Sequence, residues 1–195
     1  MSKNICVIDG HPDPSEARFI HALCDEYCIG AAAAGHQVSR VDIASLDFTP
    51  LRNKADFATE PGSIIQHERS KLAAADHVTL MFPLWLGSMP SATRAFFEQA
   101  ARASFFLDTG DNSHQWPQRM MKGKSARVVV TMGMPSIAYK MLFGSASLKA
   151  IEKGLFGISG FKPIKHTILG AVESANKEKY KTWLAKMRKL GVLGI

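Results

Sequence analysis

Five short apolar runs alternate along this chain with longer segments whose apolar residues recur at helical spacing. The apolar runs predict strands, and the run at 77–82 is typical of a buried parallel strand. The strands are expected at residues 3–9, 37–43, 77–82, 125–132 and 163–170. Helices are expected at residues 15–34, 63–75, 91–103 and 174–190, with a partly helical segment at 136–158 that is broken near Gly144. This alternation predicts a parallel sheet covered by helices on both faces.

The number of strands limits the topology of that sheet. Crossovers between parallel strands are right-handed, which leaves few arrangements. Of the two common doubly wound orders, the five-stranded flavodoxin-like order 2-1-3-4-5 fits this length better than a six-stranded sheet. No internal repeat, low-complexity tract or linker interrupts the sequence, so we expect a single α/β domain over residues 1–195.

The composition is that of a globular protein, with 46% hydrophobic and 21% charged residues. No apolar run approaches the length needed to cross a bilayer, and the first residues lack the apolar region of a signal peptide. We therefore expect a cytoplasmic protein. Cys6, Cys24 and Cys28 fit a reducing compartment, and we expect buried or half-buried thiols there rather than metal ligands.

The formal net charge of +7 allows two interpretations. A basic balance can indicate contact with nucleic acid or with an anionic membrane surface. The densest group of cations lies in the last predicted helix, where Trp183 and Met187 interleave with lysines at helical spacing. We favour an amphipathic helix with a solvated basic face, because such aromatic residues fit core packing better than base stacking. A modest positive bias also suits a ligand that bears phosphate.

The loop after the first predicted strand, residues 9–18, could bind an anion. Gly10 and two prolines fix a sharp turn, and Ser15 is a good N-cap residue for the following helix. The backbone N–H groups of residues 16–18 would then face an anion, with His11, Ser15 and Arg18 as further donors. The alternative is a plain capped helix whose polar groups face solvent. The loop matches neither a GxGxxG fingerprint nor a P-loop.

Two further loops follow the third and fourth strands, at residues 82–90 and 131–139. The first of these holds two prolines, a glycine and Trp85, and the second holds Gly133, Pro135 and Tyr139. In the order 2-1-3-4-5 these loops and the loop after the first strand meet at one sheet edge, beside the switch point where ligands bind. Trp85 alone could be a core residue. Between two other glycine- and proline-bearing loops, it suits a planar, hydrogen-bonding ring such as a flavin.

These loops resemble the flavodoxin-like NAD(P)H:quinone oxidoreductases, a family that includes DT-diaphorase, modulator-of-drug-activity-type reductases and the ancillary reductases of potassium efflux systems. The resemblance rests on Gly10-His11-Pro12-Asp13-Pro14, Phe82-Pro83-Leu84-Trp85 with Pro90, the segment from Thr131 to Tyr139, and Gly160-Phe161. It implies a bound flavin, FMN or FAD, that takes a hydride from NAD(P)H and passes the electron pair to a quinone or similar acceptor in a second step. It also implies a homodimer.

The resemblance further implies roles for individual residues. The turn from His11 to Arg18, including Ser15 and Ala17, would hold the phosphate side of the flavin, and Tyr139 would stabilise negative charge on the reduced ring. The rest of the implied cofactor site consists of Pro83, Leu84, Trp85 and Leu86 along the ring, and Thr131, Met132, Gly133 and Met134 at its pyrimidine end. Two positions depart from the family. Ala17 replaces a serine found in many relatives, and Ser145 replaces the histidine partner of the tyrosine in DT-diaphorase.

Two other functions remain open from the sequence. A one-electron flavodoxin carrier would share the fold, but such carriers are typically acidic, and the charge of +7 argues against that role. A non-catalytic or regulatory subunit that has lost its flavin would explain Ala17 and Ser145.

Overall fold

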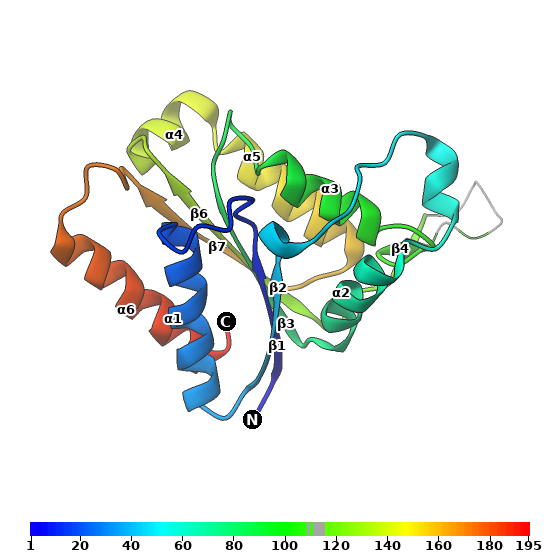
Figure 1. Cartoon of the computed structure of the whole chain (residues 1–195), viewed down its shortest axis with the longest axis horizontal. Helices are drawn as coiled ribbons and strands as arrows, with labels where there is room; N and C mark the ends of the chain where they lie inside the picture. The colour runs from blue at the N-terminus through cyan, green and yellow to red at the C-terminus, as the bar shows by residue number, and fades with distance from the viewer. Residues whose placement is uncertain (109, 111–115) are drawn as a thin grey trace.

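A five-stranded parallel sheet forms the centre of the computed structural model, which describes residues 1–108, 110 and 116–195 (Figure 1). The strands of this sheet are β1 (Asn4–Asp9), β2 (Gln37–Asp42), β3 (His77–Pro83), β6 (Ser125–Met132) and β7 (Ile164–Gly170). Their order is β2-β1-β3-β6-β7, so the predicted order 2-1-3-4-5 and the flavodoxin-like fold are confirmed. The register places Ile8 beside Leu80 and Leu80 beside Val128, which aligns apolar side chains across three strands.

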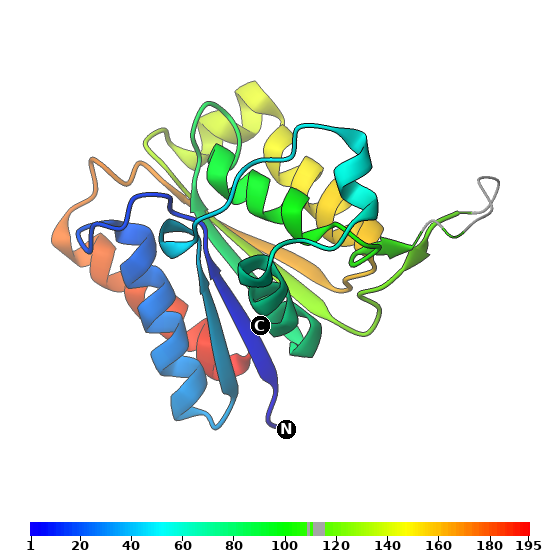
Figure 2. The ribbon, with the colours of Figure 1, turned by 45° about the vertical axis from the view of Figure 1, so that its right-hand side comes forward.

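Helices cover both faces of the sheet (Figure 2). One face carries α1 (Phe19–Ala33) and α6 (Lys177–Leu193), which lie side by side. The other carries α2 (Ser63–Ala74), α3 (Ser91–Ala100), α5 (Ala146–Lys149) and the π-helical segment η3 (Ala150–Gly157). The short helix α4 (Ser136–Phe143) follows the carboxyl end of β6, and Gly144 ends it in the left-handed conformation, at the break expected from the sequence. None of the helices in the described residues combines the length and the apolar character needed to span a membrane.

The helices α1 and α6 approach so closely that their backbones touch. A Cβ atom at Gly30 would lie 2.1 Å from the carbonyl oxygen of Arg188, and a Cβ at Gly191 would lie 2.1 Å from that of Tyr27. Trp183 of α6 packs on Phe19 with 5.8 Å between ring centroids. The aromatic residues of the basic last helix therefore belong to the core, as the amphipathic interpretation expects.

The first helix starts later than the sequence predicts. The expected helix 15–34 begins at Phe19, and Arg18 rather than Ser15 occupies the N-cap position. Ser15 is held in a preceding turn, because its N–H donates to the Asp13 carboxylate at 2.9 Å and its carbonyl oxygen accepts the N–H of Arg18. The predicted N-cap role of Ser15 is therefore wrong, and the N–H groups of residues 16–18 do not form the first turn of a helix.

The connecting segments carry small elements of their own. The stretch 47–60 contains the 3₁₀ helix η2 (Lys54–Ala58), and the short 3₁₀ helix η1 (Ile43–Ser45) follows β2. The connecting segment 105–124 contains an antiparallel pair of short strands, β4 (Leu107–Asp108) and β5 (Gln118–Arg119). Asp111 and Asn112, which the sequence places in that segment, lie outside the described residues.

Candidate functional site

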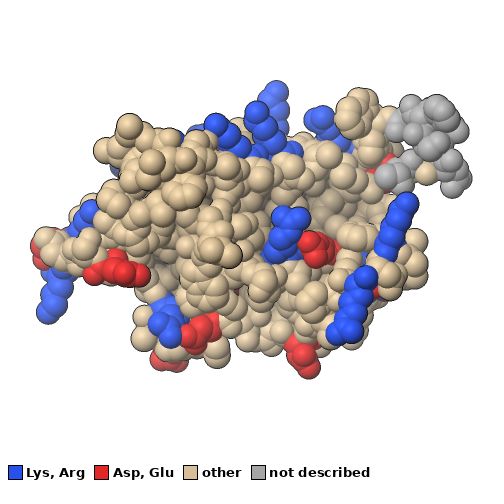
Figure 3. Space-filling view, turned by 90° about the horizontal axis from the view of Figure 1, so that it is seen from above, with Lys and Arg blue, Asp and Glu red and all other residues tan. Residues whose placement is uncertain are grey.

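Three loops leave the carboxyl ends of neighbouring strands at one edge of the sheet. We call residues 10–18 the first loop, residues 84–90 the second loop and residues 133–135 the third loop; they follow β1, β3 and β6. The adjacency of these strands confirms that the topology brings the three loops to the same edge. Figure 3 looks onto this side of the molecule, and uncharged atoms make up most of the surface in view.

The first and second loops touch each other and are anchored to the sheet. The N–H of Gly10 donates to the carbonyl oxygen of Met81 at 2.7 Å, and the hydroxyl of Thr93 donates to the carbonyl of Gly10 at 2.7 Å. A Cβ at Gly10 would lie 2.9 Å from the Met81 oxygen, so only glycine allows this approach. Beyond the glycine, the ring of His11 meets Trp85 edge to face, with 5.6 Å between centroids.

The second loop closes on itself through backbone hydrogen bonds. The N–H of Trp85 donates to the carbonyl of Ser88, and the N–H of Ser88 donates back to the carbonyl of Trp85, both at 2.9 Å. Leu86 and Gly87, at the tip, both have positive φ values, as tight hairpin turns require. The N–H of Leu84 donates to the carbonyl of Thr131 at 2.8 Å. Among the residues that the resemblance places along the ring, Leu84 and Trp85 therefore have their backbone amides bonded within the protein, and the Leu86 amide lies at the tip.

The third loop is held against the segment after β7. The carbonyl of Met134 accepts the N–H of Ala171 at 2.9 Å, and the carbonyl of Met132 accepts the N–H of Val172 at 3.1 Å. Thr131 and Met132 are buried as the last residues of β6. Gly133 is exposed, so its backbone can be reached by a ligand.

Tyr139 of α4 lies just behind the third loop and is 1% exposed. Its ring stacks on Phe143 with 6.0 Å between centroids. Its hydroxyl is buried, and no residue in the described part of the chain hydrogen-bonds to it. An unpaired buried hydroxyl costs stability, so a group that pairs with it from outside the chain would bind favourably.

The polar residues predicted for the first loop bond mostly to each other. The guanidinium of Arg18 binds the Asp13 carboxylate, with its Nε at 2.7 Å, and the hydrogen bonds from Ser15 and Arg18 lower the pKa of Asp13. The N–H of Asp13 donates to Nδ1 of His11 at 3.1 Å, which leaves the proton of a neutral ring on Nε2. Ser15, Ala17 and Arg18 are exposed, whereas His11 is buried.

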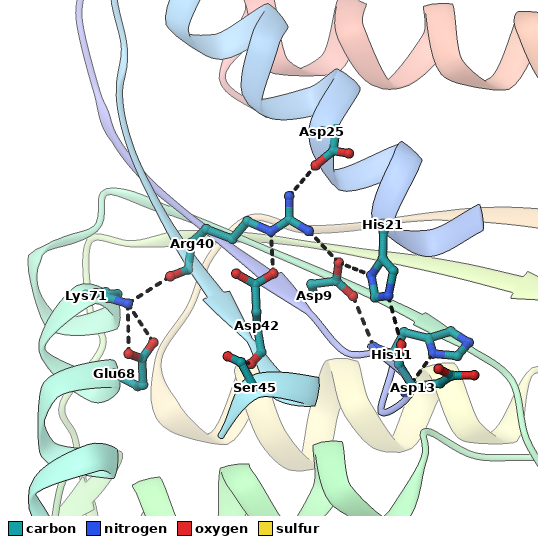
Figure 4. A network of polar contacts seen from close by, with 10 residues as sticks. All are labelled: Asp9, His11, Asp13, His21, Asp25, Arg40, Asp42, Ser45, Glu68 and Lys71. Atoms are coloured by element: carbon teal, nitrogen blue, oxygen red, sulfur yellow. Dashed lines mark hydrogen bonds and ion pairs between the residues drawn. The ribbon is translucent and has the colours of Figure 1, made fainter. Parts of the chain in front are cut away.

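A network of charged residues under the first loop was not predicted from the sequence. The buried carboxylate of Asp9 binds Nδ1 of His21 at 2.6 Å and Nη2 of Arg40 at 2.7 Å (Figure 4). The Arg40 guanidinium also binds Asp25 and Asp42. The sequence signal for this network was Asp9, which follows the apolar residues 5–8 of β1. A buried carboxylate at such a position requires cationic partners. The network spans β1, α1 and β2, which fall far apart in the sequence.

A flavin is the group that this fold family implies, and two observations of the structure fit it. The orphaned hydroxyl of Tyr139 offers a hydrogen-bond donor behind the third loop. Gly133 of the third loop is exposed, and so is Trp85 of the second loop, which is 48% accessible. In the described residues, His, Cys, Asp and Glu side chains do not assemble a metal site of three or more ligands.

Comparison with known proteins gives the family. Residues 3–190 match the Flavodoxin_2 family, described as having a flavodoxin-like fold. The chain therefore belongs to this flavodoxin-like family, as the sequence predicts.

Individual relatives are distant. The chain is 22% identical over 174 residues to an uncharacterized NAD(P)H oxidoreductase of Haemophilus influenzae, covering 87% of this chain and 84% of the relative. The structure of an NAD(P)H:quinone oxidoreductase from Methanothermobacter marburgensis superimposes with a TM-score of 0.79 at 16% identity, covering 98% of this chain and 96% of the other. That of an FMN-dependent NADH-azoreductase from Bacillus anthracis, in complex with FMN, gives a TM-score of 0.71 at 13% identity over 96% and 97% of the two chains.

Proposed function

We propose that this chain is a flavin-dependent NAD(P)H oxidoreductase that reduces quinones or similar acceptors by two-electron, ping-pong transfer. The observation that carries the proposal is the buried hydroxyl of Tyr139 behind the glycine-bearing third loop, which has no hydrogen-bond partner among the described residues. The relative named as an NAD(P)H oxidoreductase and the FMN-bound azoreductase with the same fold support a flavin and a nicotinamide as reactants.

A bound flavin would supply a carrier for the electron pair between NAD(P)H and the acceptor. The chain supplies position and electrostatics. Tyr139 would donate a hydrogen bond where negative charge develops, a contribution that is strongest in a buried site that excludes water. Gly133 and Met134 would approach the ring by their backbones, Trp85 would form a wall beside it, and the first loop, with His11, would take its phosphate side.

Two substitutions set this chain apart within the proposed mechanism. Ser145 lies in the left-handed conformation before α5, and its hydroxyl carries no charge. Tyr139 therefore has no histidine at that position to share the stabilisation of negative charge. At Ala17 the first loop offers a methyl group in place of a hydroxyl, so Ser15, Arg18 and the histidines would supply its polar contacts.

The proposed activity predicts a yellow protein. Purified protein incubated with FMN or FAD should retain flavin, lose its visible absorbance on anaerobic addition of NADH or NADPH, and regain it on addition of a quinone. A colourless protein that takes up neither flavin would overturn the proposal and favour the non-catalytic subunit. A flavoprotein that neither nicotinamide reduces would instead favour an electron carrier.

We also propose that the chain forms a homodimer through the face that contains α4. Ile137, Met141, Leu142 and Phe143 of this helix are exposed, with Met141 80% and Leu142 78% accessible. Apolar patches of this kind mark interaction sites. The chain continues from α4 into α5 and η3, where an apolar hollow of about 420 Å³ lies between η3 and α3. A second copy would cover both features, the exposed helix after the third loop and the hollow that Ser88 and Met89 of the second loop help to line.

Sedimentation of the purified protein should therefore give the mass of a dimer. Leu142→Glu is expected to shift the species to a monomer, because it places a charge in an apolar interface. Ile29→Glu, at an apolar residue of α1 that is 50% exposed, serves as the matched control and should leave the dimer intact. A wild-type monomer at micromolar concentration would contradict the dimer.

We further propose a cytoplasmic location, which suits the free thiols of Cys6, Cys24 and Cys28.

A further inference from the structure

His21 lies between two hydrogen-bond acceptors. Its Nδ1 is 2.6 Å from Oδ2 of Asp9, and its Nε2 is 2.9 Å from the carbonyl oxygen of Asp13 (Figure 4). A carbonyl oxygen can only accept a hydrogen bond, so Nε2 must carry a proton. A neutral imidazole carries one proton, and only the imidazolium donates from both nitrogens. The geometry is therefore satisfied by a doubly protonated ring beside an ionised Asp9.

The surroundings of Asp9 place the shared proton on His21. Besides His21, the Asp9 carboxylate accepts from Nη2 of Arg40 at 2.7 Å and from the backbone N–H of His11 at 3.2 Å. Three donors, one of them a permanently charged guanidinium, converge on its two oxygens. The adjacent guanidinium of Arg40 favours an ionised carboxylate, which places the proton between Asp9 and His21 on Nδ1 of His21. A charge-assisted bond therefore links β1 to α1.

Asp13 is the residue around which the first loop is folded. Its N–H binds His11, and its carboxylate binds the N–H of Ser15 and the guanidinium of Arg18. Its carbonyl oxygen binds His21 of α1. His21 thus ties the centre of the loop to the buried Asp9, beside the His11 ring that contacts Trp85.

The charges that face His21 act in opposite directions. Asp9 of β1 faces its Nδ1, Arg40 of β2 stands behind Asp9, and the His11 ring of the first loop lies 5.5 Å away between centroids. Burial lowers the pKa of His21, but the hydrogen bonds to Asp9 and to the Asp13 carbonyl together outweigh burial, and the net pKa is raised above 6.5. Burial and the neighbouring His21 charge lower the pKa of His11.

We propose that His21 is a positioning residue that holds the first loop in its anion-binding shape through its doubly protonated ring. For the flavin, the proposal rests on the function proposed above. Because the pKa of His21 is raised on folding, its contribution is complete below the ordinary histidine pKa and is lost as the pH rises through the raised value. The first loop is therefore held in place by His21 in mildly acidic solution, and it loosens in alkaline solution.

The wild-type protein without flavin provides the first test. Nitrogen-15 NMR of the histidine rings between about pH 5.5 and about pH 8.5 should show protons on both nitrogens of His21, with a titration midpoint above that of a free histidine. A singly protonated His21 at the acidic end of this range would overturn the proposal. This measurement needs neither a variant nor a cofactor.

The second test uses His21→Gln, whose amide cannot carry charge. Trypsin cleavage after Arg18 should rise about tenfold in this variant at mildly acidic pH, since cleavage follows the population of open loop. The difference from wild type should shrink as the pH rises. His67→Gln, at a histidine of α2 whose side chain is 72% exposed, is the control and should behave like wild type. Equal cleavage of wild type and His21→Gln at every pH would overturn the proposal.

The flavin measurement separates this proposal from the proposed function. The FMN dissociation constant of His21→Gln should be about tenfold higher than that of wild type at mildly acidic pH. The two dissociation constants should converge in alkaline solution. If wild type binds no flavin, the proposed function fails, while the NMR and trypsin results still decide the role of His21. If wild type binds flavin and the loop opens in the variant with unchanged affinity, the link from His21 to the flavin is overturned.

Discussion

Tyr139→Phe is expected to slow reduction of the bound flavin by NAD(P)H about 100- to 1,000-fold, because loss of a hydrogen-bond donor to developing charge has an effect of that order. The same change should raise the free energy of unfolding of the flavin-free protein by about 1 kcal/mol, since it removes a buried hydroxyl with no partner in the described residues. Anaerobic stopped-flow reduction and urea unfolding measure the two effects.

Tyr180→Phe is the matched control for both measurements. The hydroxyl of Tyr180 donates to the carbonyl of Val172 at 2.6 Å, so its removal should lower stability and leave flavin reduction unchanged. An unchanged reduction rate in Tyr139→Phe would contradict the role proposed for this tyrosine. A loss of stability in the flavin-free variant would contradict the unpaired state of its hydroxyl.

Gly10→Ala is expected to lower the free energy of unfolding by about 2 kcal/mol, as overpacking of a tight contact does. The new Cβ would lie 2.9 Å from the Met81 carbonyl and 3.0 Å from both Phe82 and Thr93, so the first loop must move away from β3. Because this movement separates His11 from Trp85, flavin affinity should fall at least about tenfold. Chemical denaturation and fluorescence titration with FMN measure the two quantities.

Gly154→Ala is the control for the packing argument. Gly154 lies in η3, and apart from its chain neighbours and its own helix backbone no atom of the described residues lies within 4 Å of a Cβ there, so alanine should be neutral or stabilising. Equal stability of Gly10→Ala and wild type would show that β3 and α3 yield to the methyl group, against the close approach described above.

The fold could be predicted from the sequence because strand periodicity and connection rules act locally. Residues 125–132 were predicted as a strand with the bounds that the structure has, and the sheet order followed from five strands and right-handed crossovers. The start of α1 could not be predicted this way. Serine is a residue type favoured at N-caps, but the Asp13 carboxylate accepts the N–H of Ser15 and holds this residue in a turn.

The candidate site was only partly accessible from the sequence. The meeting of three loops followed from topology, whereas the charged network beneath them depends on side chains that three different elements bring together. Asp9, His21 and Arg40 are separated by up to 31 residues, and no short motif joins them. The backbone bonds that occupy the amides of Leu84 and Trp85 depend on register and turn geometry, which composition alone does not specify.

The self-closed turn of the second loop has a kinetic consequence. Its backbone bonds and its two positive-φ residues are all supplied by the loop itself, so this wall is preorganised. The second loop therefore loses its conformational entropy when the protein folds, and this loss does not oppose ligand binding. Association of a ligand with this wall would be governed by diffusion and orientation, and substitutions within the turn would act mainly on residence time.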